Sequence, residues 1–549
     1  MQRRIFSAGT ANLLVMLALL LSQSALPVPA ALGQIRIPPE AFQSEEGIQQ
    51  VLEQGQELEA GRRWGDALAH YEEALRSHPG RRDLQQRLTL AKIHFDLTRR
   101  YADSSFTGTL ASTNQRRALD LYSELLLKVD SHYVNIPNWR QLVHRGTAGL
   151  EVALTEPVFR RRNLPDVPTE RIVVLRDQLR RNIDQLMVRD RHEARDAVVR
   201  AAQLAQQQLG IPPAAVVFEY ICGATGALDA YCTYLTGNQL DDVYSQIEGN
   251  FIGLGIELKA EGGSLLIVNV ITSSPAERGG VRAGDRIVQV DDQSTSDVST
   301  DTAAELLKGA RGTTVHLTVV SRVGEARRVR LRREHVEVSS VENVKIIDPE
   351  RGIGYVRLTS FPKTTSRDLD GSLWQLHEQG MKGLIIDVRG NPGGLLDASV
   401  AAADKFLTEG TIVSTRGRSP REDFDYKAHL VGTWEMPLFV LIDQDSASAS
   451  EIFAGAIRDH RRGVVIGQCS YGKGSVQGIF PLSLGQAGVR LTTAKFYLPS
   501  GQPISHRGVR PDLVVRVTAK PAIDEPVDQQ GDPVLAAALQ AAREQLVEQ

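Results

Sequence analysis

The sequence predicts a multidomain protein in which a helical N-terminal region precedes a small domain of short strands and a larger α/β domain. The chain of 549 residues exceeds one domain, and its 42% hydrophobic and 23% charged residues are typical of a globular protein. Apolar residues recur at helical spacing before residue 247, and short strand-like runs follow from 248 to 336. From residue 337, strands alternate with helices, which indicates a largely parallel sheet.

Residues 1–33 are expected to be a secretory signal peptide. The segment begins with the basic residues Arg3 and Arg4 and continues with the apolar stretch Leu13–Leu21. Small residues follow at Ala30 and Gly33, as at a cleavage site. The apolar segment is shorter than the roughly 20 residues of a membrane span. We therefore expect an exported protein with no stable membrane span after cleavage. An uncleaved N-terminal anchor is the competing interpretation.

Residues 40–110 and 111–247 are both expected to be helical. The segment 48–81 resembles one tetratricopeptide unit, because five residues match that repeat: Gly55, Ala67, Tyr71, Ala74 and Pro79. A single repeat must stack on neighbouring helices to bury its apolar face, and an ordinary helical hairpin is an equal alternative. The net charge of −3 gives no reason to expect a nucleic-acid partner.

The three cysteines match no metal site, and we expect neither a metal nor another cofactor. Cys222 and Cys232 could form a disulfide in an oxidising compartment, which would leave Cys469 unpaired. All three are expected to be structural.

Residues 248–336 are expected to form a sandwich-like domain of short strands, at 255–258, 265–270, 286–290, 314–320 and 327–332. The segments FIGLGI, 251–256, and SPAERGGVRAGD, 274–285, resemble those of a PDZ domain. This resemblance implies that a loop captures a peptide C-terminus with its backbone amides while the next strand pairs with the peptide. The loop residues are Gly253, Leu254, Gly255 and Ile256. A purely structural sandwich is the alternative.

Residues 337–520 are expected to form the α/β domain, and 521–549 a tail ending in a helix at 533–547. Strands are predicted at 352–358, 383–388, 438–442 and 463–466, with helices at 366–379 and 395–407.

Ser448 lies where a predicted strand turns into a helix, beside free backbone amides. A capping box of Ser448 and Glu451 is the simpler interpretation of this turn. Lys473, between Gly472 and Gly474, shifts the balance toward catalysis, although its spacing alone favours a solvated lysine at a turn. A serine hydroxyl needs a base, and a lysine can serve if burial lowers its pKa.

Several motifs around these residues resemble the carboxyl-terminal processing peptidases, or tail-specific proteases. DSASASEIFAGAIRD and GKGSVQ precede LTTAKFYLPSGQPI and GVRPD, and GLIIDVRGNPGG lies upstream. The resemblance covers roughly 248–517. It implies a crotonase-like serine protease core with a Ser–Lys catalytic pair.

The resemblance also implies a role for each site residue. Ser448 attacks the scissile carbonyl, and Lys473 takes its proton and later returns one to the leaving amine. Gln477 orients Lys473. The amides of Ala449 and Gly393, with Gly394 as the alternative to the latter, bind the oxyanion. Asp459 matches a family position of secondary importance, or is a surface carboxylate near Arg461.

The resemblance further implies protein or peptide substrates with free, apolar C-termini, a periplasmic location and a homo-oligomer. Two alternatives stay open. One is a Ser–His–Asp triad that uses His460 or His506. The other is a non-catalytic PDZ and repeat scaffold that only binds peptides.

Overall fold

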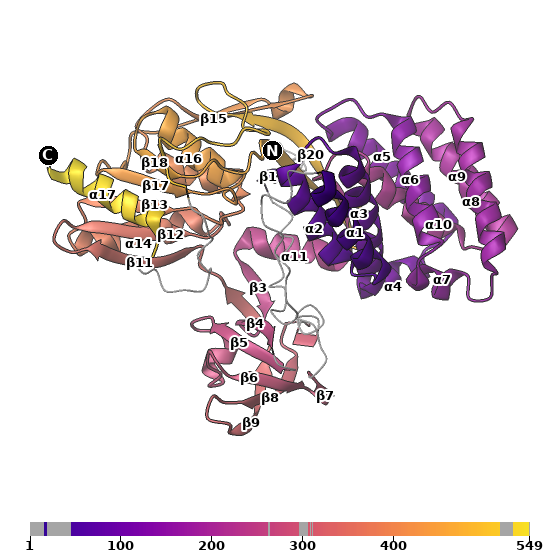
Figure 1. Cartoon of the computed structure of the whole chain (residues 1–549), viewed down its shortest axis with the longest axis horizontal. Helices are drawn as coiled ribbons and strands as arrows, with labels where there is room; N and C mark the ends of the chain where they lie inside the picture. The colour runs from indigo at the N-terminus through magenta and orange to yellow at the C-terminus, as the bar shows by residue number, and fades with distance from the viewer. Residues whose placement is uncertain are drawn as a thin grey trace, which may run out of the picture. The chain divides into compact units, whose positions relative to one another are not determined.

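The computed structural model describes residues 16–18, 45–261, 264–295, 306–307, 309, 311–516 and 531–547, and these form two compact units (Figure 1). The described part of one unit comprises residues 45–241 and 480–491; that of the other comprises 16–18, 242–479 and 492–547, with the gaps given above. The signal peptide predicted at 1–33 lies outside the described residues, apart from 16–18. No helix in the described ranges is long and apolar enough to cross a membrane.

The first unit consists mainly of helices, as the sequence predicted. They are α1 (Glu45–Ala60), α2 (Trp64–Ser77), α3 (Arg82–Ala102), α4 (Ser104–Ser112), α5 (Gln115–His132), α6 (Trp139–Ala153), α7 (Pro157–Asn163), α8 (Thr169–Asp184), α9 (Arg191–Leu209) and α10 (Pro213–Gly226). Local capping explains two of these starts: the side chains of Asp103 and Asp190 accept backbone amides in the first turns of α4 and α9. The helix α10 is buried along most of its length and packs closely on α6, where a β-carbon on Gly223 would come within 2.4 Å of the Gly146 Cα.

A hairpin from late in the chain completes this helical core. Residues 480–491 belong to the helical unit, and Leu482, Val489 and Leu491 are buried among its helices. The short strand β2 (Thr233–Leu235) pairs with the hairpin strand β20 (Gly488–Tyr497) in antiparallel register. α11 (Gly237–Glu248) then leads into the second unit. Sequence periodicity alone did not predict this long-range pairing.

Five short strands form the predicted small β domain. The sheet has the order β4 (Ile256–Glu261), β5 (Ser264–Val270), β6 (Arg286–Val290), β8 (Thr314–Val320) and β9 (Ala326–Arg332). Smaller elements are β7 (Gln293–Ser294), α12 (Pro275–Arg278), and β3 (Asn250–Gly253), which pairs with β10 (Glu334–Glu337). Alternate residues of β8 are buried, which explains why the period-2 pattern located this strand correctly.

The predicted parallel sheet is confirmed. Its order is β11 (Val341–Asp348), β12 (Ile353–Leu358), β13 (Gly383–Asp387), β17 (Leu438–Ile442), β18 (Val464–Gly467) and β21 (Leu513–Val514), and only β11 is antiparallel. The associated helices are α14 (Thr365–Glu378), α15 (Leu396–Asp404), α16 (Ala449–Asp459) and α17 (Pro533–Val547). The helix α17 packs on β13, β17 and β18.

A second sheet of this unit is antiparallel. Its order is β14 (Gly394–Leu395), β1 (Met16–Ala18), β19 (Ser475–Pro481), β20, β15 (Thr411–Gly417) and β16 (Phe424–Lys427), and the short helix η2 (Pro420–Glu422) precedes β16. The sheet therefore includes segments from the start, middle and end of the chain.

None of the three cysteines forms a disulfide, so the one considered for Cys222 and Cys232 is not present. Cys222 lies on α10 within electrostatic range of Arg100, and burial raises the pKa of its thiol to about 12.

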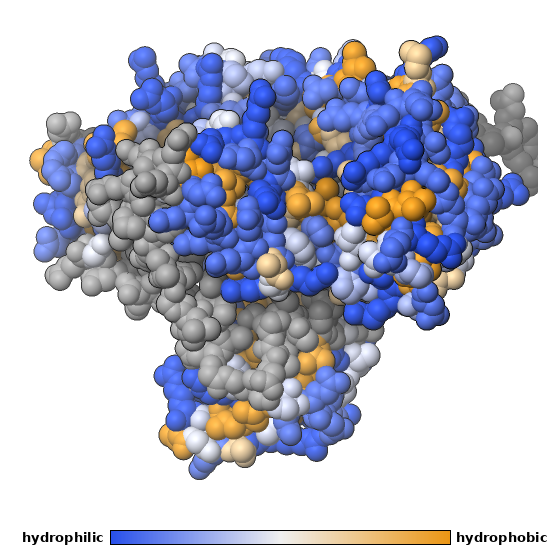
Figure 2. All heavy atoms as spheres, turned by 45° about the vertical axis from the view of Figure 1, so that its right-hand side comes forward, coloured by the Kyte–Doolittle hydropathy of each residue, from blue (hydrophilic) through white to orange (hydrophobic). Residues whose placement is uncertain are grey.

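The face in Figure 2 is mainly hydrophilic, with separate small apolar patches.

Candidate active site

Ser448 lies at a sharp turn between the parallel strand β17 and the helix α16. Its backbone has φ +57° and ψ −110°, a conformation that residues other than glycine rarely adopt. The Asp443 carboxylate stabilises this turn, because it accepts hydrogen bonds from the backbone amides of Ser446 and Gly390, each at 2.9 Å. A strained strand-to-helix turn of this kind is where α/β hydrolases carry a nucleophilic serine.

Lys473 lies in a tight loop before β19, and its side chain is fully buried. The flanking glycines allow this close approach. Gly472 has φ +90°, and a β-carbon on Gly474 would come within 2.4 Å of the Ser505 amide nitrogen. Burying the ammonium group of a lysine costs free energy. The full burial of Lys473 therefore favours a functional role over that of a solvated lysine at a turn.

The Glu451 carboxylate joins the serine turn to the lysine loop. One of its oxygens accepts the amides of Ser448 at 2.7 Å and Lys473 at 2.9 Å. The other accepts the Ser470 hydroxyl and the Gly472 amide, both at 2.6 Å. Burial raises the pKa of this carboxyl, and these hydrogen bonds oppose the shift. Both candidate catalytic residues are thus anchored by their backbones to a single carboxylate oxygen.

Gly393 lies directly against the serine turn. A β-carbon on Gly393 would come within 2.9 Å of the Ser448 Cβ and 3.0 Å of the Ala449 amide nitrogen. The Gly393 amide donates to the Asn391 side-chain oxygen at 2.8 Å, so an oxyanion would have to displace that acceptor. The structure therefore brings Gly393, Ser448 and Ala449 together, with the Gly393 amide occupied.

Gln477 lies on β19, four residues after Lys473, and it is fully buried. Its side-chain amide donates to the hydroxyls of Thr492 at 2.9 Å and Ser475 at 3.2 Å. These bonds hold the Gln477 side chain between β19 and β20, in the strand that directly follows the lysine loop.

Asp459 ends α16, at the opposite end of the helix from Ser448. Its carboxylate accepts the Ser500 amide at 3.0 Å and lies 3.7 Å from the Arg458 guanidinium. These contacts hold the turn that contains Ser500 at the end of α16 remote from Ser448. The structure does not bring Asp459 to the serine.

The two histidines of the alternative triad lie in different parts of the α/β unit. The His460 ring contacts the Thr411 carbonyl at 2.8 Å, and His460 follows α16 at the end remote from Ser448. His506 bonds to the lysine loop through its backbone amide, which donates to the Gly472 carbonyl at 2.9 Å. The contact of the His460 ring, at the end of α16 remote from Ser448, argues against His460 as the base.

Sequence reasoning missed a clamp beneath the Asn391–Gly394 turn. The Arg389 guanidinium binds Asp532 at 2.9 and 2.7 Å and Asp387 at 2.6 Å, and the Tyr355 hydroxyl donates to Asp387 at 2.8 Å. Asp532 also caps α17 by accepting the Leu535 amide at 3.1 Å. The clamp links the C-terminal helix to the turn that carries Gly393, across a separation of 143 residues that no local signal reveals.

This clamp should weaken in acid. Burial raises the pKa of Asp532, but hydrogen bonds and charge from Arg389 outweigh it and lower the pKa below its usual 3.8. The stabilisation is therefore complete above the unfolded-state pKa and is lost as pH falls through the lower folded-state value. We expect Asp532→Asn to lower the free energy of unfolding by about 1.5–3 kcal/mol at pH 7.

The measurement is the urea midpoint of the parent and the variant at pH 7 and near pH 3. The gap between them should shrink in acid. Asp120→Asn, on the exposed face of α5, is the matched control and should leave the midpoint unchanged at both pH values. A gap that persists in acid would contradict the role of this ion pair.

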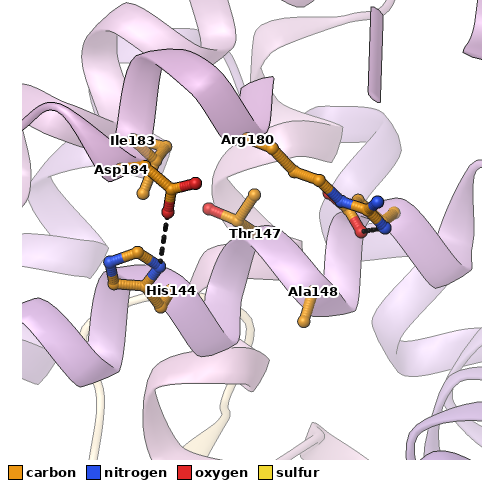
Figure 3. Close-up of a pocket in the computed structure, with 7 residues that line it drawn as sticks. His144, Thr147, Ala148, Arg180, Ile183 and Asp184 are labelled. Carbon is orange, nitrogen blue, oxygen red and sulfur yellow. Dashed lines mark hydrogen bonds and ion pairs between the residues drawn. The ribbon is translucent and has the colours of Figure 1, made fainter. Parts of the chain in front are cut away.

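The helical unit contains a pocket between α6 and α8 (Figure 3). His144 lies 3.6 Å from Asp184, and the Arg180 guanidinium donates to Glu151 at 2.6 and 2.5 Å. Each ionisable side chain in this pocket lies beside a side chain that can carry the opposite charge. We therefore assign these residues a structural role.

Comparison with known proteins supports the resemblance seen in the sequence. Residues 352–515 match peptidase family S41, and residues 266–321 match the PDZ domain. The chain is 39% identical over 302 residues to a carboxy-terminal-processing protease of Bartonella bacilliformis, covering 54% of this chain and 68% of that protein. It is 37% identical over 267 residues to a carboxyl-terminal-processing protease of Synechocystis sp., covering 48% and 62%.

The chain thus spans about two thirds of the length of these relatives. Among solved structures, a photosystem II D1 C-terminal processing protease aligns with a TM-score of 0.38 and 25% identity, over 76% of this chain and 96% of that one.

Proposed function

This chain belongs to the carboxyl-terminal processing proteases of peptidase family S41, and from that premise we propose that it is a serine endopeptidase with a Ser448–Lys473 dyad. Its substrates are proteins recognised by their C-terminal tails. The observation that carries the dyad is the shared carboxylate: Ser448 and Lys473, 25 positions apart in the sequence, both donate their backbone amides to the same Glu451 oxygen.

The reaction proceeds through an acyl-enzyme. The Ser448 hydroxyl oxygen attacks the scissile carbonyl as neutral Lys473 takes its proton, and the lysine then returns a proton to the leaving amine. The Ala449 amide and an amide of the Gly393–Gly394 turn stabilise the oxyanion, each being worth about 10²–10³ in rate. Water then hydrolyses the ester by the same route, with Lys473 as the base.

The primary test separates an enzyme from the alternative scaffold. The full chain should hydrolyse an unfolded protein that ends in apolar residues, and a fluorophosphonate probe should label one peptide, the one that contains Ser448. Labelling of a different peptide would show that Ser448 is not the nucleophile. A folded chain that neither hydrolyses nor reacts would favour the peptide-binding scaffold.

We infer that residues 248–336 select substrates by their C-termini. Gly255 has φ +78°, and its carbonyl accepts the Ile271 amide at 2.9 Å, while the Leu254 carbonyl accepts the Ala276 amide at 2.9 Å. These hydrogen bonds fix the loop that precedes β4. Because β4 is the edge strand of its sheet, a peptide can pair with it as an additional strand.

The variant Gly255→Val should raise KM for a tail-bearing substrate about tenfold, because a β-carbon on Gly255 would come within 2.2 Å of the Ser274 Cβ and would displace the loop. It should leave the KM of a short internal peptide unchanged. Gly324→Val is the matched control, since Gly324 has φ +86° with open space around it. Equal effects of the two variants would argue against tail capture by this loop.

A tail-bound domain would also gate the active site under this proposal. Deleting residues 251–336 should then change hydrolysis of an untethered peptide that carries no tail. Unchanged hydrolysis would leave the domain a tether without a gating role.

Three finer features complete the proposal. α1 and α2 pack as a tetratricopeptide-like hairpin, supported by Gly55, where a β-carbon would come within 2.3 Å of the Tyr71 ring. The protease core is crotonase-like, supported by the parallel strands β12, β13, β17 and β18 and their helices. Export to a periplasm rests on residues 1–33, and assembly into a homo-oligomer rests on the resemblance alone.

A further inference from the structure

Three alternate serines lie at the turn between β17 and α16, and the proposed reaction uses only the middle one. We call the other two, Ser446 and Ser450, the flanking serines, and both are fully buried. A buried hydroxyl costs free energy unless it forms a hydrogen bond. Each flanking serine forms that bond to a backbone carbonyl of residues 388–391, the segment that follows β13 and leads into the turn carrying Gly393.

The Ser450 hydroxyl donates to the Asn391 carbonyl at 2.9 Å, across 59 positions of the sequence. Although Ser450 is the second residue of α16, this bond lies outside its own helix. The same carbonyl accepts the Ala447 amide at 3.0 Å. A carbonyl oxygen has two lone pairs, so the serine turn supplies a donor for each of them. The serine turn therefore holds the Asn391 carbonyl at a fixed position.

The Ser446 hydroxyl fixes the beginning of the same segment. It donates to the Val388 carbonyl at 2.8 Å and accepts the Asp443 amide at 3.0 Å. The Ser446 backbone carbonyl accepts the Tyr471 amide at 3.0 Å, and Tyr471 lies two residues before Lys473. The flanking serines thus attach both ends of residues 388–391 to the turn that carries the proposed nucleophile.

The orientation of the Asn391 carbonyl controls the amides that follow it. This carbonyl belongs to the peptide group directly before Pro392, and the proline ring fixes φ at about −65°, which leaves little freedom to correct a rotation there. The Asn391 side chain holds the same residue from another direction by donating to the Leu358 carbonyl at 2.9 Å. A donor must lie about 2.7–3.1 Å from the oxyanion to stabilise it. A small shift of the Asn391 carbonyl would therefore weaken the oxyanion donors while Ser448 stays in place.

We propose that Ser450 is a positioning residue for the Asn391–Gly394 turn, and that Ser446 supports it from the other end. This inference rests on the proposed function, because the turn matters only if an oxyanion forms beside it. The middle serine is the nucleophile, and the flanking serines hold the oxyanion donors at the correct distance from it. Neither flanking hydroxyl transfers a proton in the reaction.

Ser450→Ala in the full chain is the first test. The Asn391 carbonyl keeps the Ala447 amide as a donor, so the variant should fold with a thermal midpoint near that of the parent. We expect kcat for an unfolded protein to fall about 10–100-fold with KM little changed, because a displacement near 1 Å costs up to about 10²-fold in rate.

Ser372→Ala is the matched control. Ser372 is a buried serine of α14, and its hydroxyl donates to the Asp368 carbonyl of its own helix at 2.9 Å. This variant also removes one buried hydroxyl from the α/β unit, but it leaves the serine turn intact, so it should keep the parental kcat.

A second measurement separates positioning from a general structural role. A fluorophosphonate places its phosphoryl oxygen at the oxyanion site while the Ser448 oxygen bonds to phosphorus, fluoride leaves and Lys473 takes the proton. The second-order labelling rate of Ser450→Ala should therefore fall by about the same factor as kcat. Ser450→Thr keeps the hydroxyl and should recover most of both rates. If Ser450→Ala does not fold, Ser450→Cys carries the test, because a thiol is a weak donor and should lower both rates at least about fivefold.

The outcomes separate this inference from the proposed function. If the parent chain is active and labelled at Ser448, and Ser450→Ala matches it in both rates, the inference is wrong and the protease assignment stands. A folded Ser450→Thr chain as slow as Ser450→Ala would also overturn it, because the hydroxyl would not be the cause. If the parent chain is inert and unlabelled, the proposed function fails, and the inference fails with it.

Discussion

Replacing Ser448 with alanine or Lys473 with methionine is expected to lower kcat/KM for an unfolded protein substrate by at least about 10⁴-fold, since removal of a nucleophile or its base costs this much in serine proteases. Neither change should unfold the chain. Methionine matches the length of the buried Lys473 stem and removes a polar group from a site with no solvent access.

The measurement combines kcat/KM with the thermal midpoint of each variant. Lys495→Met is the matched control, because Lys495 lies exposed on β20, and it should keep parental activity. Full activity of Lys473→Met in a folded chain would require another base and would revive His460 or His506. Loss of activity only together with a lowered midpoint would point to misfolding, and Ser448→Ala would then carry the test.

Replacing Glu451 with glutamine is expected to reduce both activity and stability. Each carboxylate oxygen accepts two donors, so an amide nitrogen at either position leaves two donors without an acceptor. A buried donor without a partner costs about 1–3 kcal/mol, which predicts a loss of about 2–6 kcal/mol in the free energy of unfolding. The serine turn and the lysine loop also lose their common anchor.

The kinetic signature should be a fall in kcat of at least about 10²-fold with KM little changed, because a displacement near 1 Å between catalytic groups costs that much. Glu422→Gln is the matched control: Glu422 is another buried carboxylate, at the end of η2, away from the dyad. A Glu451→Gln chain with parental kcat would show that this carboxylate does not position the dyad.

The sequence anticipated the local elements well. The predicted helix at 533–547 and the strands at 314–320 and 438–442 agree with α17, β8 and β17. Their apolar spacing and their breaking residues lie within the segments themselves, so neighbouring residues were sufficient to locate them. The capping-box pattern likewise drew attention to Glu451, but only as the partner of its own helix start.

Periodicity, turn residues and motif resemblance are local signals, and they were enough to predict the parallel strands and to propose the residues of the dyad. The long-range contacts became visible only in the folded chain: Glu451 also holds the lysine loop, and Arg389 binds Asp532. Each of these depends on which distant segments meet when the chain closes. That choice is made by the summed packing and hydrogen bonding of the whole unit, which no short stretch of sequence contains.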